Sequence, residues 1–391
     1  ELYRTVLSFL DPRQADTRFE VVLQIAQLEA RRGEFDQGIE LLREALATSR
    51  RVSRPWRARI LLRMALLRSR RGDFKSADTL FREGLKLAAG RDGPLNPEAF
   101  LTSISEHAAL KACLGEDDGA LELCQKAQEL AARGRSRRIR DVLLNIHATR
   151  GNVALRRFHF QEAAEHFEKA LETAEAIGSL SNRAVVLNNL GVVYSQSDRH
   201  EDAVRTFREA ARLCTRIDEG PSLMFIHGNL AVLHAKRGDF QAMEAAFSEA
   251  ASLQGGPGDR EKKGRRQELF LEHHHGLALL FRGRFEEARA HFEAAIRLGE
   301  AVGDGMAVAF GQVYRAEALI FSGLYVESER ALSPFAAGKP NRLQRMAVAR
   351  LALLKALLGS RDEVEALASR IVADERVGSL DYRDAVFLGW A

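Results

Sequence analysis

Three consecutive histidines, His273, His274 and His275, are the first candidates for chemistry in this sequence, because imidazole is a common metal ligand. The residues around them have the spacing of a helix, in which adjacent side chains point about 100° apart. Three adjacent side chains therefore cannot bind one tetrahedral metal ion. The repeat pattern described below directs His275 toward the second helix of its own hairpin and the other two toward a groove. We predict no metal site, and interpret His273 and His274 as a partner contact or as ordinary helix surface.

Motifs of known enzyme classes are absent from the sequence. It contains no GxxxxGK[ST] phosphate loop, no GxGxxG fingerprint, no GxSxG nucleophile turn and no HExxH zinc motif. Three cysteines, Cys113, Cys124 and Cys214, are too few for a disulfide framework and lack a CxxC spacing. They suit a reducing compartment, as buried thiols. We therefore predict a non-catalytic, cytoplasmic protein that needs no cofactor.

Composition and charge indicate a folded chain without a strong bias toward nucleic acid. Of the 391 residues, 46% are hydrophobic and 29% are charged, so a large core can form, and no apolar run is long enough to cross a bilayer. The net charge of +4 is small for this length and argues against a dedicated nucleic-acid binder. Two arginine clusters nevertheless keep a nucleic-acid-binding helical repeat as an alternative: Arg50, Arg51, Arg54, Arg57 and Arg59, and then Arg133, Arg135, Arg137, Arg138 and Arg140.

The elements that must position these residues come from an internal repeat of about 40 residues. The turn sequence Arg-Arg-Gly-Glu-Phe around Gly33 returns around Gly72 and, with variations, further along the chain. Turns are predicted near residues 33, 72, 115, 158, 198, 238, 283, 323 and 359. Glycine occupies most of them, because it tolerates the left-handed backbone that ends a helix. One such unit per period predicts a stack of hairpins in place of separate globular domains.

Each unit is predicted to be a pair of helices, because apolar residues recur at helical spacing on both sides of each turn. Seven residues before each turn, the first helix carries only glycine or alanine. These small residues are Ala26, Ala65, Ala108, Gly151, Gly191, Ala231, Gly276, Ala316 and Ala352. The second helix supplies a large residue, such as Phe167, Phe207 or Phe292. A small residue opposite a large one lets two helices approach closely.

This pattern resembles the tetratricopeptide repeat (TPR) family over about residues 16–373. One copy reads Leu190-Gly191, Tyr194, Ala203, Phe207 and Ala210, which matches the family signature. The long period and the missing family proline resemble the subtype found in kinesin light chains and in the sensor regions of bacterial MalT-like ATPases and kinases. The resemblance implies an all-α fold, a right-handed α-α superhelix (TPR solenoid) of about nine helical hairpins, whose first helices line a concave groove.

Three segments depart from the regular pattern. Residues 1–15 are interpreted as the end of a preceding repeat, and residues 374–391 as a partial tenth repeat or a capping helix. The two ends predict that the chain is a segment of a longer protein, and the resemblance to bacterial sensor regions implies that this is a bacterial regulatory protein. The basic stretch 254–267 is predicted to be a loop, either solvated or used for docking or cleavage.

Ligands of related TPR proteins bind to the first helices, which implies three partner-binding zones here. Arginine favours carboxylate and phosphate, asparagine pairs with peptide backbone, and exposed aromatic rings anchor partners. The arginine zone comprises Arg31, Arg59, Arg63 and Arg70. The asparagine zone comprises Asn145, Asn152, Asn188, Asn189 and Asn229. The aromatic zone comprises Phe270, His273, His274, Phe310 and Tyr314.

Each zone also has a purely structural interpretation. The arginines would form a solvated face neutralised by Glu20, Glu29 and Glu44, and the asparagines would cap or bridge neighbouring helices. The stripe of Phe225, Phe270 and Phe310 would belong to the core between repeats. The lysines of the family's carboxylate clamp are not found, which disfavours binding of chaperone tails.

We predict a non-catalytic scaffold or sensor module that binds a protein or peptide segment, or another domain of the same chain, in the concave groove. No membrane partner is expected. The alternatives are a nucleic-acid-binding helical repeat, and the regulatory arm of an upstream kinase or ATPase.

Overall fold

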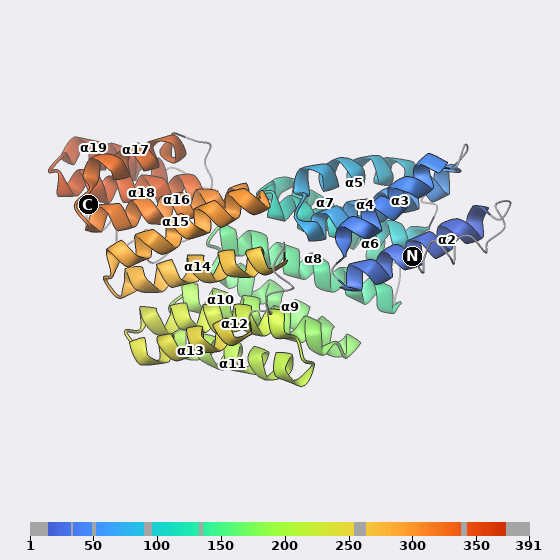
Figure 1. The fold of residues 1–391 in the computed structure, drawn as a ribbon, viewed down its shortest axis with the longest axis horizontal. Helices are drawn as coiled ribbons and strands as arrows, with labels where there is room; N and C mark the ends of the chain where they lie inside the picture. The colour runs from blue at the N-terminus through green and yellow to red at the C-terminus, as the bar shows by residue number, and fades with distance from the viewer. Residues whose placement is uncertain are drawn as a thin grey trace. The chain divides into compact units, whose positions relative to one another are not determined.

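The helical spacing of the apolar residues is borne out wherever the chain is described. The computed structural model describes residues 15–32, 34–48, 52–89, 96–132, 136–253, 263–337 and 342–372, and every regular element in these ranges is an α-helix (Figure 1). Two compact units form, residues 1–150 and 151–391, and the division falls within α8 (Arg137–Arg156). The predicted all-α class is confirmed.

The first unit contains three complete hairpins, each a first helix followed by a second helix that packs on it. Its helices before α8 are α2 (Ala15–Arg32), α3 (Phe35–Thr48), α4 (Arg54–Arg71), α5 (Phe74–Ala89), α6 (Pro97–Cys113) and α7 (Asp117–Ala131). The first helices are α2, α4 and α6, and the second helices α3 and α5 also pack on the next first helices, α4 and α6. This is the stacking that a repeat of helical hairpins requires.

The second unit continues the same arrangement through five further hairpins and the one that α8 begins. Its helices after α8 are α9 (Phe160–Ile177), α10 (Leu180–Gln196), α11 (His200–Arg216), α12 (Gly220–Lys236), α13 (Phe240–Ser252), α14 (Lys263–Phe281), α15 (Phe285–Val302), α16 (Gly305–Phe321), α17 (Tyr325–Ala336), α18 (Arg342–Leu357) and α19 (Arg361–Val372). Eighteen helices in the described ranges thus form nine hairpins, as the TPR solenoid resemblance implies.

The predicted turns coincide with left-handed backbone. Six of them carry glycine with φ between 75° and 92°, namely Gly72, Gly115, Gly238, Gly283, Gly323 and Gly359. The two turns without glycine have the same backbone, with φ of 59° at Phe158 and 58° at Asp198. Gly33 and the segments 1–14 and 373–391 lie outside the described residues. Helix α14 begins at Lys263, inside the stretch predicted to be a loop, and residues 254–262 are not described.

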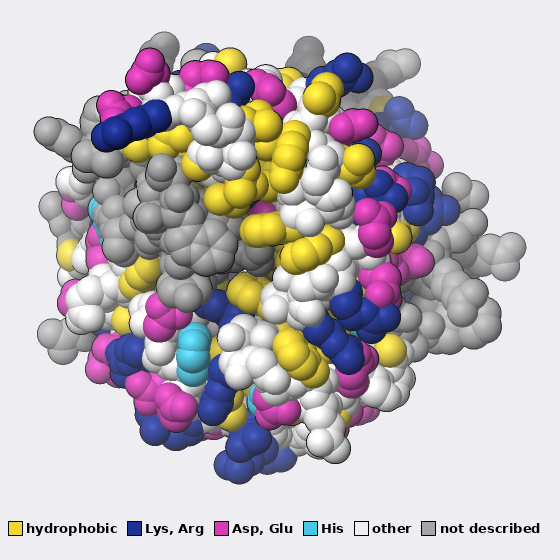
Figure 2. Space-filling model, turned by 90° about the vertical axis from the view of Figure 1, so that its left-hand side faces the viewer, with side chains coloured by type: hydrophobic (Ala, Val, Ile, Leu, Met, Phe, Trp, Pro, Cys, Tyr) yellow, Lys and Arg dark blue, Asp and Glu magenta, His cyan; other side chains and the backbone are white. Residues whose placement is uncertain are grey.

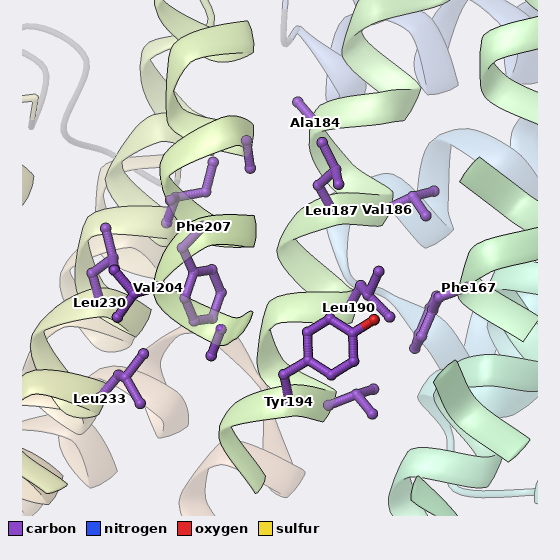
Figure 3. Packing of buried hydrophobic residues seen from close by; sticks show 14 of the residues in the cluster. Phe167, Ala184, Val186, Leu187, Leu190, Tyr194, Val204, Phe207, Leu230 and Leu233 are labelled. Atoms are coloured by element: carbon purple, nitrogen blue, oxygen red, sulfur yellow. The ribbon is translucent and has the colours of Figure 1, made fainter. Parts of the chain in front are cut away.

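Small residues let the two helices of a hairpin touch at the predicted positions. A Cβ added to Gly191 would lie 2.7 Å from the ring of Phe207, and one added to Gly276 would lie 2.6 Å from Phe292. Both rings are buried. Figure 3 shows the ring of Phe207 directed from α11 toward α10, the helix that carries Leu187, Leu190 and Tyr194. Only glycine allows a phenylalanine ring to lie directly on the helix backbone at these crossings.

Within the second unit, the first and last hairpins touch each other. The guanidinium of Arg345 on α18 lies 4.6 Å from the centre of the Phe158 ring, at the turn after α8. Phe158 is 1% exposed and Arg345 is 2% exposed, although turn residues of a hairpin stack ordinarily face solvent. All side chains from Gln344 to Leu354 of α18 are buried. Helix α18 is therefore covered by other parts of the chain on every side, and Phe158 is one of the residues that cover it.

Candidate functional site

The arginine zone of the first unit is largely compensated by carboxylates. Arg59 on α4 pairs with Glu20 on α2 at 2.7 Å, and its guanidinium also lies 4.3 Å from the centre of the Trp56 ring. Burial lowers the pKa of Arg63, which interacts electrostatically with Glu106 on α6. Burial raises the pKa of Glu106, and Arg70 and Arg63 oppose that shift.

The Arg59–Glu20 pair agrees with the solvated-face interpretation, whereas Arg63 and Glu106 are partly withdrawn from solvent. Glu20 neutralises Arg59 as that interpretation predicts. Glu29, by contrast, is 3% exposed and faces the interior. Glu106, which the sequence did not single out, takes its place near Arg63 and Arg70. The side chain of Arg31 lies outside the described ones.

In the asparagine zone, two side chains form a hydrogen bond with each other and three form none with a described residue. The side-chain nitrogen of Asn229 on α12 donates a hydrogen bond of 2.9 Å to the side-chain oxygen of Asn188 on α10. This pair bridges consecutive first helices, as the structural interpretation predicts. The side chains of Asn152 and Asn189 are half-buried and form no hydrogen bond with another described residue. The same holds for Asn145 in the first unit.

The aromatic zone lies in the seam between α12, α14 and α16. Phe270 contacts Phe225 edge to face, with ring centres 4.5 Å apart, and stacks on His274 at 3.7 Å. A Cβ added to Gly228 would lie 2.5 Å from the Phe270 ring, so this ring packs against the backbone of α12. The Nδ1 atom of His274 lies 2.8 Å from the carbonyl oxygen of Phe270. Burial lowers the pKa of His274 to about 4, so this imidazole is neutral at pH 7.

The remaining members of the aromatic zone are also engaged in packing. Tyr314 is 8% exposed, because its ring stacks on Phe292 with centres 5.7 Å apart and meets His273 edge to face at 5.4 Å. It therefore lies in the core between repeats and does not present its ring to a groove. Phe310 is half-buried and packs against the same core.

His275 contacts α15, the second helix of its own hairpin as predicted, and also α13 of the preceding hairpin, whose Phe247 ring stacks on it with centres 3.8 Å apart. The ring centre of His275 lies 5.0 Å from that of His291, on the second helix of its own hairpin, and His291 in turn lies 2.7 Å from Glu272. The described residues include no group of three or more histidine, cysteine, aspartate or glutamate side chains that could hold a metal ion. Cys124 and Cys214 are buried, and burial raises the pKa of the Cys124 thiol to about 11, so it stays protonated at neutral pH.

Two buried polar clusters were not found from the sequence. In the first unit, Asp78 on α5 lies 2.8 Å from Nε2 of His107 and 2.8 Å from Nζ of Lys111, both on α6. In the second unit, Glu317 and Arg350 pair on α16 and α18. Each cluster joins helices of consecutive hairpins. The only sequence signal was a charged residue adjacent to a small core position, namely Asp78 after Ala77 and Glu317 after Ala316.

Surface charge is mixed on the face that Figure 2 shows, where acidic and basic side chains are interspersed. Hydrophobic side chains gather in its upper part, at the height of α17–α19 in Figure 1. Val326 on α17 and Leu357 on α18 are large hydrophobic residues that are exposed, at 69% and 53%. None of the helices in the described ranges combines the length and the apolar character that a membrane span requires.

Comparisons with known proteins agree with the fold. The tetratricopeptide repeat model matches residues 18–89, 142–216 and 182–254. No curated protein matches the chain. Among solved structures, the chain is similar to a Rap protein complexed with competence and sporulation factor, with 13% identity, a TM-score of 0.59, and coverage of 96% of this chain and 99% of that one.

Two further solved structures are similar over most of their length. Aspartyl phosphate phosphatase F from Bacillus subtilis has 13% identity and a TM-score of 0.56, with 83% of this chain and 94% of that one covered. NprR in complex with its cognate peptide NprX has 13% identity and a TM-score of 0.54, with 80% and 88% covered. At these identities the similarity establishes the arrangement of the helices, which is that of stacked hairpins.

Proposed function

We propose that this chain, which is built from tetratricopeptide repeats, is a non-catalytic module that binds an extended protein or peptide segment along the first helices of its second unit. The observation that carries the proposal is the pair of half-buried, unbonded amides of Asn152 on α8 and Asn189 on α10. Each amide offers a donor and an acceptor, which can pair with a peptide backbone whatever its sequence.

The neighbouring contacts support this role for Asn189. Asn188 and Asn229 brace α10 against α12, so Asn189 is carried by a first helix that is held in place. A rigid scaffold loses little entropy when a ligand binds, so most of the ordering cost falls on the peptide. NprR, a solved structure of the same fold, holds its cognate peptide. The ion pairs of the arginine zone, in contrast, leave less free positive charge for nucleic acid.

The experiment starts from peptides selected on the purified chain from a displayed random library. The affinity of a labelled, selected peptide is measured for the chain and for Asn152→Ala, Asn189→Ala and the double variant. We expect each single change to weaken binding about tenfold, the typical effect of losing two charge-neutral hydrogen bonds.

Asn182→Ala provides the matched control. Asn182 lies on the same helix as Asn189, in its first turn, and is also half-buried. We expect this variant to bind the peptide within about twofold of the unchanged chain. Circular dichroism should show equal helicity for all variants. If selected peptides bind equally well to the chain and to the double variant, the asparagines are structural and the proposal is wrong.

A further inference from the structure

A row of arginines lies on the outward face of α11, the second helix of the hairpin that begins with α10. Arg205, Arg208, Arg212 and Arg216 follow each other at spacings of three and four residues, so they share one face of the helix. The opposite face carries Phe207 and is buried against α10. All four arginines are exposed.

Carboxylates compensate only part of this charge. Arg205 pairs with Asp202 at 2.6 Å. The two glutamates on the outer face are also occupied, since Glu201 pairs with Arg237 at 3.5 Å and Glu209 pairs with Arg183 at 3.5 Å. Within the described part of the chain, Arg208 and Arg212 form no ion pair with a carboxylate. Arg216 also forms none among the described residues, so three positive charges are left over on this face, and Arg208 and Arg212 lie one helical turn apart.

The surface is hollowed beside these two residues. A hollow of about 630 Å³ is lined by Arg208 and Arg212, together with Arg205, Glu201, Glu209 and the apolar side chain of Val204. A second, smaller hollow of about 350 Å³ at Gly283–Glu287 provides a contrast. Its one arginine, Arg284, is paired with Glu287. The hollow on α11 thus combines a recess with uncompensated guanidinium groups.

We propose that this hollow binds an acidic peptide segment of a partner protein, whose carboxylates pair with Arg208 and Arg212. Residues four apart on a helix are separated by about 6 Å along its axis. Alternate residues of an extended peptide are separated by about 6.6 Å and point to the same side. Two acidic residues at positions i and i+2 of such a segment therefore reach the two guanidinium groups together, and each guanidinium donates two parallel hydrogen bonds to one carboxylate.

The same surface fits nucleic acid less well. Glu201 and Glu209 line the hollow beside the arginines and would repel a continuous row of phosphates. A peptide with separated carboxylates can place uncharged residues opposite these glutamates. The surface lies on a second helix, apart from the first helices of the proposed peptide groove, so this inference does not depend on the proposed function.

The test uses a fluorescein-labelled peptide of alternating glutamate and alanine residues, whose binding to the full chain is followed by fluorescence anisotropy at low salt. We expect saturable binding that weakens as salt is raised. Replacing both arginines, Arg208→Glu and Arg212→Glu, should weaken binding at least about tenfold, because attraction becomes repulsion. Both side chains are exposed, so we expect the variant to keep the helicity of the unchanged chain.

Arg297→Glu is the matched control. Arg297 follows Phe292 on α15 by five residues, as Arg212 follows Phe207 on α11, and it is exposed but does not line the hollow. We expect this variant to bind within about twofold of the unchanged chain. The proposal is overturned if the peptide does not bind, or if Arg297→Glu weakens binding as much as the double variant. It is also overturned if a single-stranded RNA of equal charge binds more tightly and loses its binding in the double variant.

Discussion

The guanidinium of Arg350 lies 2.8 Å from the carboxylate of Glu317, with both side chains fully buried between α18 and α16. Glu317 directly follows the small residue of its first helix, and Arg350 precedes the small residue of the next first helix by two positions. The same two positions hold Asn152 and Asn189 on α8 and α10. We infer that polar residues at these two positions of the first helices have one of two roles. They either bond one repeat to the next or remain available to a ligand.

Breaking the buried ion pair should be costly. Arg350→Met removes the guanidinium and leaves the Glu317 carboxylate in the core, which we expect to destabilise the second unit by about 3–5 kcal/mol. The double variant Glu317→Leu with Arg350→Met removes both charges and should recover most of that loss. Urea unfolding followed by circular dichroism measures both. A single variant as stable as the unchanged chain would contradict the burial of this pair.

The close contact between Gly191 and Phe207 predicts that replacing this glycine by alanine destabilises the fold, although alanine is the better helix former. Gly191→Ala places a methyl group against the ring, and we expect the overpacking to cost about 1–3 kcal/mol, more than the roughly 1 kcal/mol that alanine gains as a helix former. Gly119 on α7 has no atom within 4 Å of an added Cβ. Gly119→Ala should therefore be neutral or slightly stabilising. Thermal melting of both variants decides the point.

Replacing Phe158 distinguishes two contributions to stability, the local backbone preference of its turn and the long-range contact of its ring with Arg345. Glycine adopts positive φ without strain, so a purely local turn would be stabilised by Phe158→Gly. We expect the opposite, a loss of about 3 kcal/mol, because the ring is buried beneath Arg345. Asp218 has a φ of 54° and is exposed. Asp218→Gly should leave stability unchanged or raise it slightly, and equal outcomes for the two substitutions in urea unfolding would refute the contact between hairpins.

Acid should weaken the region around α14. Burial lowers the pKa of His274 from its ordinary 6.5 to about 4, and burial also lowers the pKa values of His275, His227 and His234. Between pH 6.5 and 4 the unfolded chain therefore binds more protons than the folded chain, so stability falls as pH falls through this window. His274→Phe removes one of these groups and should show a shallower decline. The urea midpoint measured across this pH range checks the difference in slope, which should vanish above about pH 7.

Much of the fold could be predicted from the spacing of residue types along the sequence. The period near 40 residues, the turns at Gly72 and Gly283, and the small residues opposite Phe207 and Phe292 all act between residues of one hairpin or of adjacent hairpins. Such contacts recur at constant sequence separation, so they leave a pattern that a single sequence shows.

The candidate site was predicted less completely. The sequence indicated that Asn188 and Asn189 lie on a first helix, but they are adjacent residues of the same type. One bonds to Asn229 and the other does not, because their side chains leave the helix about 100° apart. Likewise, the position of Tyr314 in its repeat predicts that it lines the groove. In the structure, however, its neighbours Phe292 and His273 bury it.

By itself, then, the sequence determined the helices, their pairing and the small-to-large contacts within each hairpin, because these depend on residues at short, repeated separations. Only the tertiary structure decided that Phe158 contacts Arg345, that Glu317 and Arg350 are buried together, and that three guanidinium groups of the arginine row on α11 have no carboxylate partner among the described residues. Each of these depends on the angle between successive hairpins. That angle is set by many side chains packing at once and accumulates along the stack, so no local pattern records it.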